Sequence, residues 1–303
     1  MPHPEQHTTS QRKPLIFAGM AALVAAFAWA YWSSIEHLMH RWTVEPEYSH
    51  GFFVPAFAAI LLWLRWDMIS PDRLRGSLWG LVLLGLGGAM RLASAYFYYD
   101  LLDPISLLPT LAGIALFVGG WHAIRWAWPS IVYLIFMIPL PGIFAGALSG
   151  RLQGIATGAS VYALQMIGIA ATARGNVIAL TTSELEVAQA CSGLRMLIVF
   201  FATSTAVAFL AERRLWEKII VLLSAIPIAV ISNVIRIMAT GVAQEYFGTD
   251  FAIGIFHDQA GYLMMPMALV FLWLELNLLD WLVAESDETG ATTTAKPRKA
   301  APS

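Results

Sequence analysis

The chain has 303 residues, of which 58% are hydrophobic and 13% are charged, and its formal net charge at pH 7 is -2. A soluble domain carries about 25% charged residues, so this chain has too few to cover a surface that faces water on all sides, and lipid must form part of its solvent. No broad basic patch is present, which argues against a nucleic-acid partner.

Apolar runs long enough to cross a bilayer recur along most of the chain. A helix needs about 20 apolar residues to span the hydrocarbon, and this length predicts transmembrane helices at 14–33, 51–69, 76–98, 102–120, 126–148, 193–211, 217–242 and 261–284. In the fifth of these spans, the run Pro139-Leu140-Pro141-Gly142 is predicted to end or kink the helix. The polar residues 1–13 and the Thr-, Ala- and Pro-rich residues 285–303 flank a single transmembrane domain, 14–284. The tail has too little apolar surface to fold and is predicted to be disordered.

The distribution of basic residues orients the predicted spans. Cytoplasmic loops carry an excess of Lys and Arg, and segments rich in these residues alternate regularly with loops that are poor in them. The basic residues of the rich segments are Arg12, Lys13, Arg65, Arg73, Arg75, Arg125, Arg213, Arg214, Lys218, Lys296, Arg298 and Lys299. Eight spans with both termini in the cytoplasm place all of them inside. A ninth span at 151–173 would break this alternation, so we expect that stretch to lie on the outer side, in or near the interface, although its composition leaves a crossing open.

A short hairpin is predicted on the outer side, before the sixth span. Val177, Ala179, Leu185 and Val187 alternate with other residues around a polar turn, which is typical of short strands. Lipid satisfies no backbone groups, so such a hairpin needs water or protein at its edges. We therefore predict an all-α polytopic membrane protein with about eight transmembrane helices and a small extracytoplasmic cap, made of a short hairpin and an interfacial helix.

The predicted directions bring three chemically suited residues to the outer side. Cys191, the one cysteine of the chain, lies at the outer end of the sixth span, and His257 lies just outside the last. Arg236 lies about 9 Å below the outer end of the seventh span, given the helical rise. A thiolate is a nucleophile, and an imidazole can accept the thiol proton and later protonate a leaving amine. A guanidinium can stabilise an oxyanion.

Each of these residues also has a structural interpretation. A free cysteine is often a small buried hydrophobe, and His257 lies in a loop where it could be solvated or cap a helix. Arg236 could pair with Glu184 or Glu186 in a structural ion pair. An arginine inside the membrane costs at least about 2.5–3.5 kcal/mol on insertion scales, which favours a functional role for Arg236.

Three neighbours of these residues are candidate supporting groups. Asn233 precedes Arg236 by three residues on the same helical face and could orient it. Arg195, one turn after Cys191, could assist the site, contact lipid headgroups or snorkel outward, and these alternatives stay open. Ser192 is not excluded as a nucleophile, although the chain has no Gly-x-Ser-x-Gly elbow.

His50 is the alternative to His257 as the base. It lies on the predicted outer side, directly before the second span, within a segment where Ser49 could cap the helix and Tyr48 could anchor it at the interface. The seven histidines and the lone cysteine are scattered along the chain and lack the spacing of a zinc site. No Gly-rich phosphate loop follows a predicted strand, so we expect neither a metal nor a cofactor.

Four segments resemble the exosortase/archaeosortase family. They are Ala190-Cys191-Ser192-Gly193-Leu194-Arg195, Asn233-Val234-Ile235-Arg236, His257-Asp258-Gln259-Ala260-Gly261 and, as the amino-terminal signature of bacterial members, Tyr48-Ser49-His50-Gly51-Phe52. The likeness covers nearly the whole apolar chain. Archaeal members often have Arg where His257 stands, so the sequence is most similar to the bacterial exosortases, and within them to the exosortase A subgroup.

The resemblance implies a multi-pass protein of the bacterial inner membrane that acts as a cysteine endopeptidase or transpeptidase. Its catalytic residues would be Cys191, Arg236 and His257. Its substrates would be exported proteins with a carboxy-terminal Pro-Glu-Pro motif, a membrane span and a basic tail, in a system linked to exopolysaccharide and surface protein sorting. Such a basic tail places the Pro-Glu-Pro segment on the periplasmic side, where Cys191 is predicted. The acceptor nucleophile, the cognate substrates and the oligomeric state stay open.

Two other classes of function are compatible with the residues alone. A non-enzymatic transporter or assembly component for a surface polysaccharide would use Arg236 to bind an anionic substrate. A structural scaffold would simply pack Cys191 among apolar neighbours.

Overall fold

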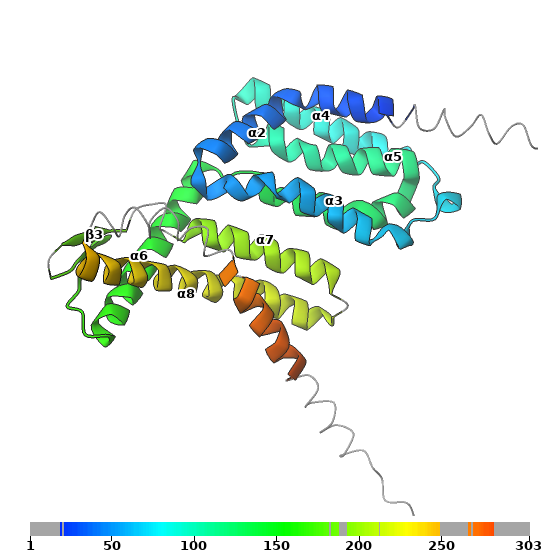
Figure 1. Ribbon diagram of the computed structural model, residues 1–303. Coiled ribbons are helices and arrows are strands. Elements are labelled where there is room, and N and C mark those ends of the chain that lie inside the picture. Colours follow the sequence, from blue (N-terminus) through cyan, green and yellow to red (C-terminus); the bar gives the residue numbers. More distant parts are fainter. Residues whose placement is uncertain are drawn as a thin grey trace, which may run out of the picture. The chain divides into compact units, whose positions relative to one another are not determined.

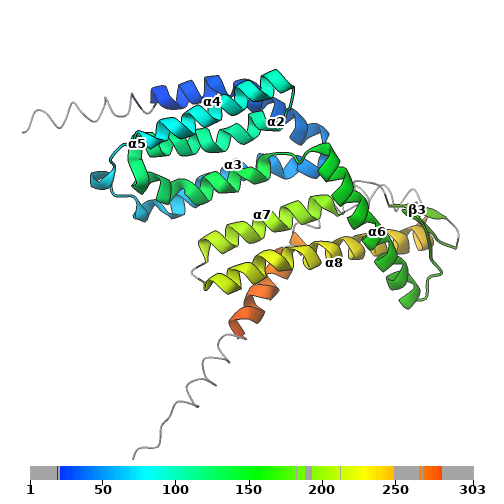
Figure 2. The same ribbon diagram turned by 180° about the vertical axis from the view of Figure 1, so that it is seen from behind.

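The described residues of the computed structural model are 19, 21–181, 183–187, 193–211, 213–248, 266–267 and 269–281. Most of them lie in helices, and they include one small sheet (Figures 1 and 2). Among them, the helices long and apolar enough to cross a membrane are Pro46–Leu64, Trp79–Phe97, Leu102–Met137 and Leu215–Phe247. The predicted all-α polytopic membrane fold is thereby confirmed, while the predicted terminal segments 1–13 and 285–303 lie outside the described residues.

The chain divides into two compact units, Met1–Leu140 and Pro141–Ser303. The described part of the first unit consists of helices joined by short loops. In chain order these are the short apolar helix Ala21–Ala30, α2 (Trp32–Val44), the 3-10 helix η1 (Pro46–Phe52), α3 (Val54–Leu64), the 3-10 helices η2 (Trp66–Met68) and η3 (Pro71–Arg73), α4 (Trp79–Phe97), α5 (Leu102–Tyr133) and the 3-10 helix η4 (Leu134–Met137).

Helix α2 is absent from the elements that the sequence predicts. It buries Ser34, Leu38 and Trp42, which recur every four residues on one face, and polar side chains interrupt the apolar run between them. A search for long apolar stretches passes over such an amphipathic helix. The indole Nε1 of Trp42 donates to the backbone carbonyl of Met137 at 2.8 Å, which ties the end of α2 to the end of η4.

Helix α5 is a helical hairpin, because the chain reverses at Gly120, where φ is 67° and ψ is -159°. Before the turn the helix packs on α4, with the backbone of Gly80 against that of Gly113. After the turn it runs back along α3, since the indole Nε1 of Trp126 donates to the carbonyl of Leu62 at 3.1 Å. The reversal depends on glycine for two reasons. The positive φ is strained for a residue with a Cβ, and a Cβ here would also meet the carbonyl oxygen of a neighbouring loop.

The two passes of α5 and η4 correspond to the predicted spans 102–120 and 126–148. The second pass ends at Met137, and the next helix begins only at Gly142. The predicted break at the Pro139–Pro141 run is therefore confirmed. The predicted extension of this span to residue 148 is wrong, because the two prolines and the residues before them disfavour a continuous helix.

Replacing Gly120 with alanine is expected to lower the free energy of unfolding by about 1–3 kcal/mol. The added Cβ would lie 1.9 Å from the carbonyl oxygen of Arg75, and the positive φ is strained for any residue with a Cβ. Gly85 in α4 is the matched control, since a Cβ there meets nothing within 4 Å. Thermal unfolding in detergent should show a lower Tm for Gly120→Ala and an unchanged or higher Tm for Gly85→Ala. Equal Tm values for the two variants would contradict the prediction.

Four basic residues of the first unit lie at one of its ends: Arg65, Arg73, Arg75 and Arg125. The guanidinium of Arg65 donates through Nη2 to the carbonyl of Arg125 at 3.2 Å, and the carbonyl of Arg75 faces Gly120. Arg73 lies in η3, between these positions in the same loop. The two loops predicted to be cytoplasmic thus meet at one end of the unit, as the positive-inside pattern requires.

The second unit combines long helices with the sheet. Its elements are α6 (Gly142–Met166), β1 (Thr172–Arg174), β2 (Val177–Ala179), β3 (Glu184–Glu186), α7 (Leu194–Leu210), α8 (Leu215–Phe247) and a last helical segment that includes residues 269–281. Helices α7 and α8 pack side by side, and α6 crosses them at a steep angle in both views (Figures 1 and 2). Such a crossing suits a helix that lies along the membrane surface, as predicted for 151–173, more than one that spans it.

The strands form one antiparallel sheet in the order β1-β2-β3. Thr172 pairs with Ala179, and Val177 pairs with Glu186. The predicted hairpin is confirmed in its strands β2 and β3, and β1 adds a third strand that the alternation did not reveal. The fully buried Ile178 packs the sheet into a core with residues of α6 and α8, including Ala156, Val161, Leu164 and Ile237.

Helix α8 is longer than its predicted span of 217–242. It has 33 residues and runs to Phe247, so it is about 50 Å long at the helical rise, whereas the hydrocarbon of a bilayer is about 30 Å thick. The last helical segment runs antiparallel to it. Met267 packs beside Ala229, and Asp280 accepts a hydrogen bond from Arg213 at 3.0 Å. The last segment therefore ends at the basic end of α8, as predicted for a helix that runs inward.

Candidate functional site

Three of the seven residues in the predicted site lie outside the described residues: Cys191, Ser192 and His257. The other four are described. Asn233 and Arg236 lie on α8, Arg195 lies in the first turn of α7, and His50 lies in η1 of the first unit. The second unit therefore holds the described part of the predicted catalytic group.

The start of α7 packs against α8 at Asn233. Gly193 caps α7 with a φ of 87°, and a Cβ at this position would lie 3.2 Å from Nδ2 of Asn233. The positive φ suits glycine, and the absent side chain lets the α7 backbone approach the amide of Asn233 closely. The first residue described after Cys191 and Ser192 is thus in contact with the polar face of α8.

Arg236 lies one turn beyond Asn233 on the same buried face of α8. Arg236 is 5% exposed and Asn233 is 1% exposed, and the hydroxyl of Thr240 donates to the carbonyl of Arg236 at 3.0 Å. The predicted shared face of these two side chains is confirmed. A charged guanidinium this deeply buried needs polar partners, because an isolated buried charge costs far more than a helix gains from one residue.

The acidic residues of β3, Glu184 and Glu186, are the ones that could form a structural ion pair with Arg236, and both are exposed. Glu184 and Glu186 both lie on the surface of the sheet. Oε1 of Glu184 lies 3.8 Å from Nη1 of Arg174, and both of these side chains are mostly exposed. Glu184 therefore has an ion-pair partner on its own sheet.

Two buried glutamines, which the predicted site does not include, hold the strand that leads toward Cys191. The side-chain amide of Gln153, on α6, donates through Nε2 to the carbonyl of Val187. That of Gln244, on α8, donates to the carbonyl of Glu184 at 3.1 Å. The signal in the sequence was the polar Gln153 within a run of small and apolar residues, but its partner lies 34 residues away.

A small closed cavity adjoins this place. It has a volume of about 10 Å³ and is lined by Leu152, Ala156, Gly193, Ala229, Val230 and Asn233. A volume of this size holds about one water molecule. The described residues around Asn233 are therefore close-packed, and the polar groups at this junction lie in contact with protein.

His50, the alternative base, is held between two backbone carbonyls. Its Nδ1 lies 3.1 Å from the carbonyl oxygen of Glu47, and its Nε2 lies 3.0 Å from that of Phe136. The imidazole is 5% exposed. A neutral imidazole carries one N–H, so both carbonyls can be satisfied at once only by the protonated ring. This geometry ties η1 to η4 and gives His50 a structural role within the first unit.

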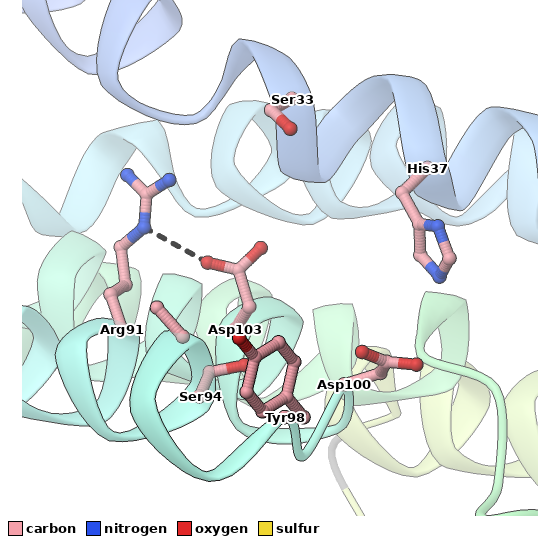
Figure 3. A pocket seen from close by; sticks show the side chains of 8 residues that line it. Ser33, His37, Arg91, Ser94, Tyr98, Asp100 and Asp103 are labelled. Atoms are coloured by element: carbon pink, nitrogen blue, oxygen red, sulfur yellow. Dashed lines mark hydrogen bonds and ion pairs between the residues drawn. The ribbon is translucent and has the colours of Figure 1, made fainter.

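A larger polar cavity lies in the first unit, and none of the residues of the predicted site lines it. It has a volume of about 390 Å³ and is lined by Ser33, His37, Arg91, Ser94, Ala95, Tyr98, Asp100 and Asp103 (Figure 3). Arg91 Nε donates to Asp103 at 2.9 Å, its Nη1 donates to the carbonyl of Ala30, and the guanidinium lies 4.4 Å from the ring centre of Tyr31. The guanidinium is therefore occupied in joining α4 to its neighbours, and most of the other lining side chains are exposed.

Comparison with protein families identifies one for this chain. A family described as transmembrane exosortase matches residues 42–274, which is more than half of the chain. The matched range includes the elements from the end of α2 through α8 and the positions of Cys191 and His257. No curated protein and no solved structure matches the chain significantly.

Proposed function

Since this chain belongs to the transmembrane exosortase family, a family of membrane-embedded, sortase-like transpeptidases that process sorting signals, we propose that it is a cysteine endopeptidase/transpeptidase. Its substrates would be exported proteins that end in a Pro-Glu-Pro motif, a membrane span and a basic tail. Within the family, the exosortase A subgroup and its link to exopolysaccharide systems belong to the same proposal.

The observation that carries the proposal is the contact of Gly193 with Asn233, which precedes the buried Arg236 by one turn on α8. Consecutive Cα atoms are about 3.8 Å apart, and only Ser192 separates Cys191 from Gly193. The chain therefore tethers the thiol-bearing residue within about 7.6 Å of Gly193, which touches the buried polar face of α8. A thiol close to a buried guanidinium would suit acyl transfer, because the guanidinium can stabilise the oxyanion that forms when the thiolate attacks a carbonyl.

The last helical segment supports His257 as the third member. This segment begins on the side of Ala229 and ends beside Arg213, and His257 precedes it by ten residues at Met267. Met267 packs against a cluster that includes Ala229, which precedes Asn233 by one turn on α8. The position of His257 itself is outside the described residues.

The proposed reaction has two halves. The thiolate of Cys191 attacks the scissile carbonyl while His257 takes up the thiol proton, and a C–S bond forms as the carbonyl oxygen becomes an oxyanion stabilised by Arg236. The intermediate collapses, the C–N bond breaks, and His257 returns the proton to the departing amine. The thioester then passes its acyl group to an amine acceptor or to water, and the thiol is regenerated.

The length of α8 indicates where this chemistry lies in the membrane. Leu215 follows the basic loop, and Arg236 lies 21 residues further on, about 32 Å along the axis. This distance matches the hydrocarbon thickness of about 30 Å, so we place Arg236 at the outer boundary and not 9 Å below it. The sheet and the last turns of α8 then stand in water. In a bacterial inner membrane with both termini cytoplasmic, this side is the periplasm.

The test of the proposal is mass spectrometry of a reporter protein that ends in a Pro-Glu-Pro motif, a membrane span and a basic tail. Coexpression with this protein is expected to give a new carboxy terminus at or near the motif. A free carboxylate at that terminus indicates hydrolysis, and an added mass indicates transfer and identifies the acceptor. An intact reporter in cells that contain the protein in their membranes would overturn the proposal.

The two histidines are expected to respond differently to replacement by alanine. His257→Ala should remove processing with little change in thermal stability. His50→Ala should lower the free energy of unfolding by about 1–3 kcal/mol, because it removes a buried ring that hydrogen-bonds to the backbone of η1 and η4. Reporter processing and thermal unfolding measured on the same samples check both. If His50→Ala alone removes processing at unchanged stability, the base is His50 and the assignment to His257 is wrong.

A thiol probe separates the enzyme from the two alternative classes. An enzyme should form a thioester at Cys191 that hydroxylamine releases, and substrate should protect the thiol from alkylation. A transporter or assembly component that uses the buried Arg236 for an anionic polysaccharide predicts neither result. A scaffold predicts that replacing Cys191 changes no product at all.

A further inference from the structure

The segment from β3 to Val187 brings the chain toward Cys191, and amides from two different helices hold it. Gln153 on α6 donates to the carbonyl of Val187, and Gln244 on α8 donates to that of Glu184. Gln153 is 7% exposed and Gln244 is 3% exposed. A carbonyl oxygen only accepts, so the nitrogen of each side-chain amide must be the donor. We name these two side chains the amide clamp.

The sheet itself leaves β3 in need of such support. β3 pairs with β2 along one edge only. Val187 donates to Asn176, and the carbonyl of Ser183 accepts from Leu180, so the odd-numbered residues of this segment face β2. Backbone groups alternate between the two edges of a strand, so Glu184 presents its carbonyl to the open edge. Gln244 satisfies that carbonyl. Gln153 satisfies the carbonyl of Val187, which follows Glu186, the last residue that pairs with β2.

The position of Gln153 cannot be explained by packing alone. Its helical neighbours on the same face are apolar or carry small hydroxyls, and an apolar side chain of similar size would fill the same space. A buried carbonyl left without its donor costs about 1–3 kcal/mol, so the amide contributes a bond that an apolar side chain cannot make. That bond fixes the backbone four residues before Cys191.

We propose that Gln153 is a positioning residue that anchors the backbone at Val187 and thereby sets the approach of the chain to Cys191. The effect of Gln153 on catalysis rests on the proposed function of Cys191 as the nucleophile, whereas its anchoring of the backbone at Val187 does not. Gln244 anchors the start of β3, at Glu184, in the same way.

The chain offers a matched control on the same helix. Gln165 also lies on α6 and also donates through Nε2 to a backbone carbonyl, that of Ala171 at 2.8 Å. Ala171 directly precedes β1, the strand at the opposite edge of the sheet from β3. Gln165→Glu therefore removes a bond of the same kind, made by a more exposed side chain, without touching the segment that ends at Val187.

The experiment uses the full-length protein in lipid nanodiscs, with a nitroxide spin label on the one cysteine of the chain. The variants are Gln153→Met, Gln153→Glu and Gln165→Glu. Electron paramagnetic resonance reports the mobility of the label at Cys191, and hydrogen exchange reports the protection of the Val187 amide. Thermal unfolding of each labelled sample verifies that it is folded.

Gln153→Met is expected to add a mobile component to the spectrum and to raise hydrogen exchange at Val187 at every pH. Gln153→Glu should do so only at high pH, because an ionised carboxylate cannot donate a hydrogen bond. At low pH the protonated carboxyl donates to the Val187 carbonyl and should restore the immobile spectrum. A simple packing defect would show no such reversal. Gln165→Glu should match the wild type throughout.

The effect on catalysis is tested by measuring kcat and KM for processing of the reporter by the unlabelled proteins. Gln153→Met should lower kcat by about tenfold or more, since small misplacements of reacting groups cost up to about a hundredfold, and it should leave KM within a factor of two. Gln165→Glu should leave both constants unchanged.

The outcomes separate this inference from the proposed function. A Gln153→Met label as immobile as that of the wild type overturns the positioning role, whatever the reporter shows. Equal mobilisation in Gln165→Glu also overturns it, because the effect would then be a general loosening of the sheet. If Gln153→Met does not fold, the pH reversal in Gln153→Glu decides alone. The label could be mobile in Gln153→Met while even the wild type leaves the reporter intact. This result would support the anchoring role of Gln153 and contradict the proposed peptidase function.

Discussion

Replacing Cys191 with alanine is expected to abolish processing of a Pro-Glu-Pro reporter while the protein stays in the membrane. The substitution removes the only thiol of the chain, and no other residue can form the thioester. In acyl-transfer enzymes, loss of the nucleophile lowers kcat by several powers of ten, so we expect a loss of at least about 10³-fold. The check is the amount of cleaved reporter per amount of membrane-inserted protein, measured by mass spectrometry and immunoblotting.

The neighbouring serine provides the control for this prediction. Ser192→Ala changes the adjacent residue by one oxygen atom and should retain most of the activity, since no Gly-x-Ser-x-Gly elbow activates that hydroxyl. N-ethylmaleimide should inactivate the wild type by reacting at one site only, because the chain has no second cysteine. Normal processing by Cys191→Ala would exclude the thiol as the nucleophile and would leave Ser192 as the residue to test next.

Replacing Arg236 with lysine is expected to lower kcat by about 10²–10³-fold, although the positive charge is kept. Loss of one preorganised donor to an oxyanion has a cost of this size. Lysine presents a point charge in place of a planar fork of donors, and its ammonium loses its charge more readily when buried. At 5% exposure, Arg236 has little room for a water molecule to take over the missing contacts. Single-turnover rates with a reporter peptide measure the chemical step directly.

Arg174 supplies the matched control for the arginine prediction. It lies on β1 in the same unit, its side chain is 74% exposed, and its ion pair with Glu184 is long, at 3.8 Å. Exposed pairs of this kind contribute about 0–1 kcal/mol, so Arg174→Lys should leave both kcat and stability unchanged. Full activity in Arg236→Lys would show that charge alone suffices and would contradict support of the oxyanion by the guanidinium fork.

Several features of the fold follow from local properties of the sequence. The spans 76–98 and 102–120 coincide closely with α4 and the first pass of α5, because an uninterrupted apolar run has no stable place except in lipid or a core. The alternation around Val177 and Leu185 predicts strands that the structure contains. The break at Pro139 is equally local, since proline acts on its own helix and on the residue before it.

Features that depend on an unusual backbone conformation or on an amphipathic helix were harder to predict from the sequence. The predicted spans 102–120 and 126–148 place the reversal directly after Gly120, but they do not indicate that Gly120 itself makes the turn, because a glycine within an apolar run is no signal by itself. The positive φ becomes informative only when the carbonyl of Arg75 is seen against that glycine. Helix α2 escaped prediction because its buried Ser34, Leu38 and Trp42 make a narrow stripe instead of a long run.

For the site, the residue types that carry the proposed chemistry were visible in the sequence. An arginine within an apolar span is conspicuous because burying its charge is costly, and Asn233 shares its helical face by simple periodicity. The length of α8 was predicted incorrectly from the apolar run. Since α8 continues to Phe247, Arg236 lies further from the helix end than the apolar run suggested, and its proposed depth changes accordingly.

By itself, the sequence determined the class of the protein and the positions of its main helices along the chain, because hydrophobicity and charge are properties of single residues and short runs. Only the tertiary structure decided which backbone meets which side chain: Gly193 against Asn233, and Gln153 on the carbonyl of Val187. Such contacts join residues 34 or more positions apart. Their partners are selected by the packing of whole helices, which no local pattern encodes.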